Sequence, residues 1–321
     1  MTTTTATASR PVTPDPNRPA PGPAPVRWRD RFADPVFTVI ATGILLFALT
    51  AVIYPLYFVV IASVSEPSAI YEGRVWLWPQ GFTLEGYQHI LSDGRILRGF
   101  GNSLLYTVLG TTIAVGVTLC AGYALSRKDL PFRGFLMMLF IVTMFFDGGL
   151  IARYLVVKDL GMLNTIWAVV LPGAVGVWNL IIARSFFEQN IPQELMEASM
   201  LDGASDFRFF TRIVLPLSVP LIMLMTMTHM VAYWNSFFDA LIYLQDDNLY
   251  PLQLILRNIL IQQELTATAG TGSIDSYAAA QRTAELTKYA MIIISSAPLL
   301  IALPFLQKHF TKGALIGAVK S

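Results

Sequence analysis

Charged side chains are scarce in this chain of 321 residues. Asp, Glu, Lys and Arg make up 13% of it, against 54% hydrophobic residues. Soluble domains carry about 25% charged residues. So few charges would leave a large apolar surface facing water, which indicates an integral membrane protein. The formal net charge of +1 provides no basic field that would favour nucleic acid as a partner.

Side chains that carry chemistry are also few. The single cysteine, Cys120, lies in an apolar run, and we expect it to be a small buried residue rather than a nucleophile. The sequence has no GxxxxGK[ST] loop for ATP phosphates. No Ser/His or metal-ligand set falls within the apolar runs. We therefore expect a non-catalytic chain that holds no cofactor or metal of its own.

Six apolar runs predict an all-α membrane protein with six transmembrane helices, since a span needs about 20 apolar residues. The third run is the weakest, because Arg133 and Asp147 bracket a short uncharged centre. The runs cover residues 36–63, 102–125, 132–152, 165–186, 211–238 and 288–306.

These runs divide the chain into four parts. Residues 1–30 hold seven prolines and predict a disordered, Thr/Pro-rich tail. Residues 31–100 contain the first span and an outer loop, 101–307 form a five-helix core, and 308–321 form a second tail. Lys and Arg are denser in the segments that lie inside if the N-terminus is cytoplasmic. The positive-inside rule therefore places both termini in the cytoplasm.

The cytoplasmic loop between the fourth and fifth runs has the pattern of two short helices. Pro192 and Glu194 are typical of a helix start. Gly203 allows a left-handed turn, and Ser205 or Asp206 could cap a second helix. The apolar Met, Leu and Phe side chains of the loop need a cover. Lipid headgroups or a partner protein could supply it, and the small number of Lys and Arg favours the partner.

The same loop resembles the EAA signature of permease subunits of ABC importers, Glu-Ala-Ala-x-x-Asp-Gly-Ala followed by Phe, Ile, Leu-Pro and Pro at fixed offsets. Ser199 departs from the pattern, because the family usually has Ala there. The matching positions are Glu197, Ala198, Ser199, Asp202, Gly203, Ala204, Phe210, Ile213, Leu215, Pro216 and Pro220.

The resemblance extends from about residue 70 to the end of the chain. Tyr233-Trp234-Asn235-Ser236-Phe237-Phe238-Asp239-Ala240 and Tyr250-Pro251-Leu252-Gln253 are similar to the carbohydrate-uptake class with a MetI-like transmembrane domain. Within that class they resemble the branch of G-type maltose permeases and lipoprotein-type oligosaccharide permeases. The resemblance implies half of a translocation path for a sugar or oligosaccharide in a bacterial inner membrane. It also implies a second permease subunit as heterodimer partner, two ATPase subunits that bind the ATP, and an extracytoplasmic solute-binding protein.

Two contacts with the ATPases are implied by the resemblance. The loop, here residues 194–215, would be a coupling helix in which Glu197 meets a basic residue of the ATPase and Gly203 allows the turn. The C-terminal residues Lys312 to Lys320 resemble the tail of the G-type maltose permease, so Gly313, Gly317 and Lys320 would reach between the ATPases. The alternative for this tail is a frayed basic end that serves only the inside charge rule.

The centres of the runs lack Asp, Glu, Lys and Arg, which argues against an ion-coupled secondary transporter. Aromatic and amide side chains of the fourth and fifth runs are candidates for the sugar path, although such residues also anchor helices at membrane interfaces or bond neighbouring helices. His229 is expected to pack between helices. The candidates are Trp178, Asn179, Tyr233, Trp234 and Asn235.

Asp147 and Arg153 are unusual for this branch. They could pair across the outer end of the third run. Alternatively, Arg153 could help an anionic oligosaccharide, such as a uronide, to pass. An ABC permease for a non-sugar solute remains the alternative function, because the residues do not specify which solute is carried.

Overall fold

The computed structural model of the chain describes residues 35–269, 282, 284 and 286–305. Every regular element in these residues is a helix, which confirms the predicted all-α class. The chain divides into two compact units, Met1–Leu56 and Tyr57–Ser321. The described part of the first unit lies in α1 (Pro35–Ser63). Only 6% of the most apolar window of this helix is buried, so it presents apolar side chains all round, as a helix in lipid does.

The second unit contains long apolar helices joined by short ones. The elements after α1 are α2 (Pro67–Tyr71), α3 (Glu85–Ser92), α4 (Gly94–Ser126), α5 (Arg133–Phe145), α6 (Gly149–Asp159), α7 (Ile166–Val170), α8 (Val177–Asn190), α9 (Gln193–Leu201), α10 (Asp206–Phe209), the π-helix η2 (Phe210–Val214), α11 (Leu215–Leu217), α12 (Val219–Trp234), α13 (Phe238–Tyr243), the 3₁₀-helix η3 (Asp247–Leu249) and α14 (Leu252–Ala269). The C-terminal helix of the described residues is Leu286–Phe305.

Three helices among the described residues are long and apolar enough to cross a membrane: Phe37–Ser63, Gly94–Ser126 and Leu286–Phe305. Two further pairs qualify if each bent pair counts as one span. One is α5 with α6, bent by 118°, and the other is Asp206–Leu217 with α12, bent by 79°. The described part of the chain therefore has up to five candidate spans, and the predicted number of six remains a prediction.

The predicted fourth span, residues 165–186, is not one continuous helix. It consists of α7 and α8, separated by Leu171–Gly176. Pro172 follows Leu171 directly and is followed by Gly173. Proline removes a backbone hydrogen bond and glycine lowers helix propensity, so this stretch interrupts the helix despite its apolar composition.

The core of the second unit is built around α4, which packs against α8 and α12. Two glycines on α4 permit the close approach. A Cβ at Gly110 would lie 2.7 Å from the ring of Tyr233, and one at Gly122 would lie 2.7 Å from the Cβ of Ala183. Small residues at such contacts are typical of helices that pack within a membrane. Cys120 lies on the exposed side of the same helix, so the prediction that it is buried is wrong.

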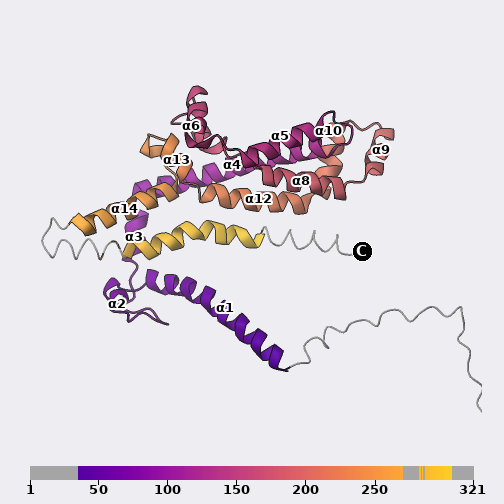
Figure 1. The fold of residues 1–321 in the computed structure, drawn as a ribbon. Helices are drawn as coiled ribbons and strands as arrows, with labels where there is room; N and C mark the ends of the chain where they lie inside the picture. Colours follow the sequence, from indigo (N-terminus) through magenta and orange to yellow (C-terminus); the bar gives the residue numbers. More distant parts are fainter. Residues whose placement is uncertain (1–34, 270–281, 283, 285, 306–321) are drawn as a thin grey trace, which may run out of the picture. The chain divides into compact units, whose positions relative to one another are not determined.

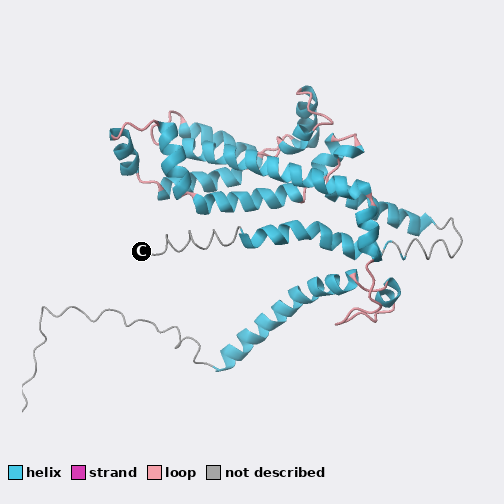
Figure 2. Ribbon diagram, turned by 180° about the vertical axis from the view of Figure 1, so that it is seen from behind, coloured by secondary structure: helices cyan, strands magenta, loops and turns pink. Residues whose placement is uncertain are grey.

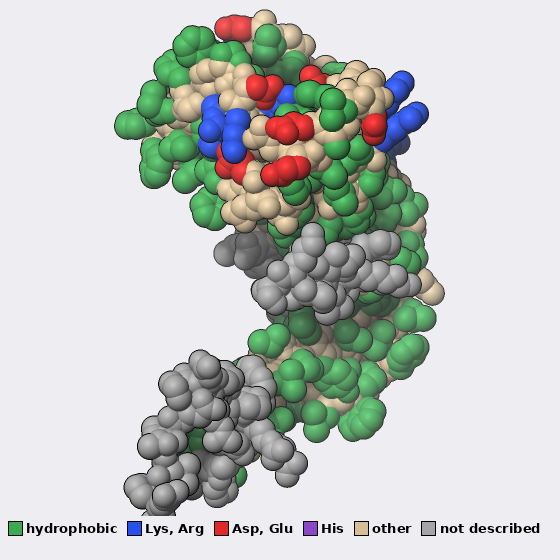
Figure 3. Space-filling view, turned by 90° about the vertical axis from the view of Figure 1, so that its right-hand side faces the viewer, with side chains coloured by type: hydrophobic (Ala, Val, Ile, Leu, Met, Phe, Trp, Pro, Cys, Tyr) green, Lys and Arg blue, Asp and Glu red, His purple; other side chains and the backbone are tan. Residues whose placement is uncertain are grey.

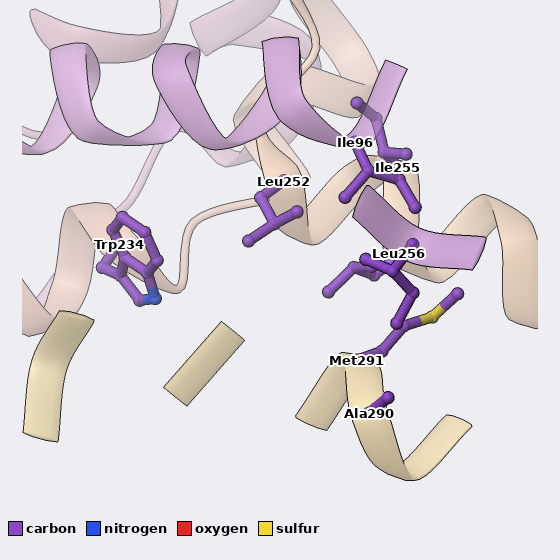
Figure 4. Packing of buried hydrophobic residues seen from close by; sticks show 8 residues of the cluster. Ile96, Trp234, Leu252, Ile255, Leu256, Ala290 and Met291 are labelled. Atoms are coloured by element: carbon purple, nitrogen blue, oxygen red, sulfur yellow. The ribbon is translucent and has the colours of Figure 1, made fainter. Parts of the chain in front are cut away.

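A cluster of buried hydrophobic residues joins α3, α4, α12, α14 and the C-terminal helix (Figure 4). Trp234 is 2% exposed, and its indole Nε1 donates a hydrogen bond of 2.8 Å to the carbonyl of Ser295. Because a buried indole N–H needs a partner, this bond anchors the C-terminal helix to α12. The labelled members of the cluster are Ile96, Trp234, Leu252, Ile255, Leu256, Ala290 and Met291.

Within the second unit, the short elements gather at two opposite ends of the long helices. Helices α9 and α10 lie at one end, and α6 and α13 lie at the other (Figures 1 and 2). The loop that resembles the EAA signature is therefore far from the residues around Arg153.

Candidate functional site

The signature loop forms a helical hairpin (residues 193–217). We call it the coupling hairpin, after the role that the resemblance implies. Helix α9 begins after Pro192 and ends at Leu201. Gly203 has a φ of +75°, its N–H donates to the carbonyl of Met200, and the N–H of Ala204 donates to the carbonyl of Ser199. This pair of bonds is a Schellman motif, which satisfies the last carbonyls of a helix and reverses the chain. The predicted glycine turn is confirmed.

The second arm of the hairpin begins with a side-chain cap. The Ser205 Oγ accepts a hydrogen bond of 3.3 Å from the backbone N–H of Arg208, so Ser205 rather than Asp206 caps α10. The helix then continues through η2 and α11 to a bend at Ser218. A π-helical turn shifts the register of side chains by one residue, and such turns are frequent at functional sites.

The tip of the hairpin exposes apolar side chains. Leu201 is 91% exposed, Phe207 77% and Met200 48%. Glu197 and Ala198 are also exposed, and the Glu197 carboxylate accepts a hydrogen bond of 3.0 Å from Gln193 Nε2 on the same helix. Figure 3 looks at this end of the molecule and shows acidic and basic side chains gathered among hydrophobic ones. A surface of this mixed kind is suited to a protein partner.

The base of the hairpin is anchored in the core. Phe209 is 2% exposed and belongs to a cluster with Phe187 and Val214. Phe210 is half-buried, with its ring centroid 4.9 Å from that of Tyr123 on α4. Ser199 is buried and bonds back to the Met196 carbonyl at 2.8 Å. This bond satisfies the hydroxyl, so Ser fits where the family usually has Ala.

A cavity of about 630 Å³ lies behind the hairpin, between it and the loop that joins α4 to α5. Its wall is both charged and apolar, with Arg127, Arg184, Glu188 and Met196 among its residues. Arg184 and Glu188 pair along α8 at 2.9 Å.

At the end of the described residues that holds the hairpin, the Arg127 side chain makes several hydrogen bonds. Its guanidinium donates to Asp129 at 2.8 and 2.7 Å, to the Tyr123 hydroxyl at 3.2 Å and to Asp206 at 3.3 Å, and it also contacts the sulfur of Met196. Hydrogen bonding from Arg127 holds the pKa of the Asp129 carboxyl below its usual range, and the bond to Asp129 raises the pKa of Arg127. Both groups therefore stay charged at neutral pH.

The aromatic and amide residues predicted for the substrate path differ in exposure and in hydrogen-bond partners. Trp178 is 64% exposed, whereas Tyr233 is buried and donates a hydrogen bond of 2.8 Å to the carbonyl of Val170. The Nδ2 atom of Asn179 on α8 lies 3.1 Å from Nε2 of His229 on α12. His229 is buried, which confirms that it packs between helices. Asn235 is exposed and bonds to the carbonyl of Val231.

Trp234 is engaged in anchoring the C-terminal helix. The predicted tail contacts Gly313, Gly317 and Lys320 lie outside the described residues. Neither the tail nor the substrate path is therefore tested by this arrangement, and both remain predictions.

Arg153 pairs with Asp239 rather than with Asp147. The guanidinium nitrogen of Arg153 lies 3.7 Å from the Asp239 carboxylate, while Asp147 accepts a hydrogen bond from the backbone N–H of Gly149. The expected pairing is wrong because α6, which holds Arg153, packs on α13 through Tyr154 and Tyr243. Burial raises the pKa of Asp239, and the charge of Arg153 opposes that shift.

Sequence reasoning missed Arg127, Tyr123, Asp206 and Asp239 as site residues. Arg127 and Asp206 are 79 residues apart, and Arg153 and Asp239 come from different predicted loops. A signal was present at Arg127, since it is the first charged residue after a long uncharged run. Its partner could not be identified without the fold.

Residues 92–315 match the family described as binding-protein-dependent transport system inner membrane component. The chain is 40% identical to Protein LplC of Bacillus subtilis (strain 168), over 84% of this chain and 89% of that protein. It is 38% identical to the polygalacturonan/rhamnogalacturonan transport system permease protein YtcP of the same organism, over 89% of this chain and 98% of that protein.

A solved structure is also similar. It is the crystal structure of a bacterial ABC transporter involved in the import of the acidic polysaccharide alginate. One of its chains is 26% identical and superposes with a TM-score of 0.77, covering 88% of this chain and 98% of that chain.

Proposed function

Since this chain belongs to the family of inner membrane components of binding-protein-dependent transport systems, we propose that its coupling hairpin carries the motion of separate ATPase subunits into the membrane. The chain is a permease subunit of an ABC importer and forms half of the translocation path for a sugar or oligosaccharide. The single observation that supports the role of the hairpin is its geometry. Leu201 and Phe207, on either side of the glycine turn, are exposed, while Phe209 of the second arm is buried in the core.

The proposal extends to the assembly. A second permease subunit forms the other half of the path, two ATPases bind the ATP, and an extracytoplasmic binding protein delivers the solute. The chain itself performs no catalysis. It has six spans in a bacterial inner membrane with both termini cytoplasmic, and its core is residues 101–307. ATP binding that brings the ATPases together would select one of two arrangements of the bundle through the hairpin.

We expect Gly203→Val to release the ATPase subunits from the purified complex, because a β-branched residue is strained at a φ of +75° and the turn must change. Gly161→Val is the matched control, since Gly161 has a φ of +67° and equally open surroundings at the end of α6. Glu197→Lys should also lower recovery of the ATPases by reversing a charge at the exposed face of α9. Recovery of the ATPases with Gly203→Val at the level of Gly161→Val would contradict the proposal.

We further propose that the solute is an acidic oligosaccharide. Arg153 supports this, because it lies at the end opposite the hairpin, is 47% exposed and makes one long ion pair. The relatives named for polygalacturonan/rhamnogalacturonan and alginate transport point to the same class of solute. Proteoliposomes that contain the whole importer should take up oligogalacturonates in preference to neutral maltooligosaccharides of the same length. Preference for the neutral sugar would contradict an acidic substrate.

A further inference from the structure

We propose that Arg127 is a positioning residue that ties the coupling hairpin to the cytoplasmic end of α4, so that a displacement of the hairpin reaches the membrane bundle through this side chain. The proposal rests on the proposed role of the hairpin as the ATPase contact. It adds a second route of transmission beside the continuous backbone.

The position of Arg127 suits a link between elements. It is the residue that follows the last turn of α4, and its side chain is only 14% exposed although it is charged. One guanidinium nitrogen, Nη1, reaches both the Tyr123 hydroxyl on α4 and the Asp206 carboxylate at the start of α10. The contact with Met196 adds α9 to the set. A single side chain thus contacts α4 and both arms of the hairpin.

Aromatic packing reinforces the link. The Arg127 guanidinium carbon lies 6.0 Å from the centroid of the Tyr123 ring, within the range of a cation–π contact. The same ring packs on Phe210, the first residue of η2, and on Phe187 of α8 at a centroid distance of 5.8 Å. Arg127 and Tyr123 therefore form one unit that holds the second arm of the hairpin against α4.

Neither end of the hairpin continues into a long helix without a break. A side-chain link to α4 would therefore transmit a displacement that the backbone alone transmits poorly. On one side, Ile191 and Pro192 are extended between α8 and α9. On the other side, the chain bends by 79° between α11 and α12. Helix α4 is instead continuous over 33 residues, about 50 Å at 1.5 Å per residue. At its far end, Asn102 and Tyr106 bond to the carbonyls of Asn248, Tyr250 and Leu249 in the outer loop.

Asp129 and Asp206 allow a sharp test, because both accept from Arg127 but only one is on another element. The bonds to Asp129 are the shorter ones, yet Asp129 is two residues away in the same loop. The bond to Asp206 is longer and joins α4 to α10. A merely local stabilising role would make Asp129→Asn the more harmful change. A role in linking elements makes Asp206→Asn and Arg127→Gln the harmful ones.

Spin labels in the assembled importer measure the link directly. In a Cys120→Ser background, labels at Val117→Cys on α4 and Arg208→Cys on α10 report the distance between the two elements by pulsed electron paramagnetic resonance. We expect one narrow distance distribution in the parent protein and in Asp129→Asn. We expect a broad one in Arg127→Gln and Asp206→Asn, and an intermediate one in Arg127→Lys, because one ammonium group cannot bond to all the partners at once.

Transport of oligogalacturonate per ATP hydrolysed is the functional readout. Arg127→Gln and Asp206→Asn should lower it by roughly two- to thirtyfold, the range found for residues that couple distant sites, while the ATPases still co-purify. Unchanged distances in Asp206→Asn, or equal broadening in Asp129→Asn, would overturn the assignment to Arg127. Retained ATPases in Gly203→Val would instead overturn the hairpin as the docking site, so the two failures are distinguishable.

Discussion

At the scale of single residues, two arginines of this chain have opposite environments. Arg127 is 14% exposed and its donors are occupied by two carboxylates and a hydroxyl. Arg153 is 47% exposed, and its ion pair with Asp239 is 3.7 Å long, which is longer than a hydrogen bond. The first is suited to holding protein groups together. The second has donors that meet no acceptor in the part of the chain that the structure describes, and these could bind an anion. A carboxylate on a solute would compete for Arg153 with Asp239, whose raised pKa reflects poor solvation of its charge.

We therefore expect Arg153→Gln to lower uptake of oligogalacturonates by roughly ten- to a hundredfold, since a hydrogen bond to a charged group contributes about 1.5–3 kcal/mol. Uptake of any neutral oligosaccharide should change little, and Arg153→Lys should keep part of the activity. Arg74→Gln is the control, because Arg74 is also an exposed arginine with a single ion pair, to Glu72. Equal losses for charged and neutral oligosaccharides would show that Arg153 only stabilises the fold.

At the scale of elements, close packing of α4 on its neighbours depends on glycine at some positions and not at others. A Cβ at Gly122 would meet the Cβ of Ala183 at 2.7 Å and the backbone nitrogen of Arg184 at 3.2 Å. The backbone of α8 cannot move without separating the helices. Gly116 lies on the same helix with nothing within 4 Å of its Cβ position.

Gly122→Ala should therefore destabilise the protein by about 1–3 kcal/mol, the usual cost of overpacking. Gly116→Ala should leave stability unchanged or raise it, because alanine is the better helix former. Thermal unfolding of the two variants in the same detergent measures the difference. A melting temperature of Gly122→Ala equal to that of Gly116→Ala would show that α4 and α8 are not packed as described.

At the scale of the whole molecule, the membrane topology depends most on residues 132–152. This run was the weakest of the six predicted spans, and the structure bends it by 118° into α5 and α6. A bent pair of this kind either crosses the membrane or returns to the side from which it came. Lys128 precedes α5, Lys158 lies in the last turn of α6, and both side chains are exposed.

Labelling of single cysteines in a Cys120→Ser background should decide whether α5 and α6 cross the membrane or return to the same side. With six spans, Lys158→Cys reacts with a membrane-impermeant maleimide in intact spheroplasts, and Lys128→Cys reacts only after the membrane is opened. The positive-inside rule gives the direction. If both cysteines react from the same side, α5 and α6 form a re-entrant loop, and the six-span topology is wrong.

The sequence by itself determines that this protein is an all-helical membrane chain with a helix–glycine turn–helix hairpin. These features follow from local properties of the chain. Long apolar runs are stable as helices in lipid, and glycine at position 203 adopts a positive φ without steric cost. The signature around Glu197 is also enough to indicate the family, because it is a pattern of residues and spacings.

Only the tertiary structure decided which groups meet. In the folded chain, Tyr233 and Trp234 are buried and donate hydrogen bonds to distant carbonyls. Arg153 pairs with Asp239, and Arg127 lies between α4 and both arms of the hairpin. The residues of these four contacts are between 61 and 86 positions apart in the sequence. Such contacts depend on how whole helices bend and pack, which local composition does not specify.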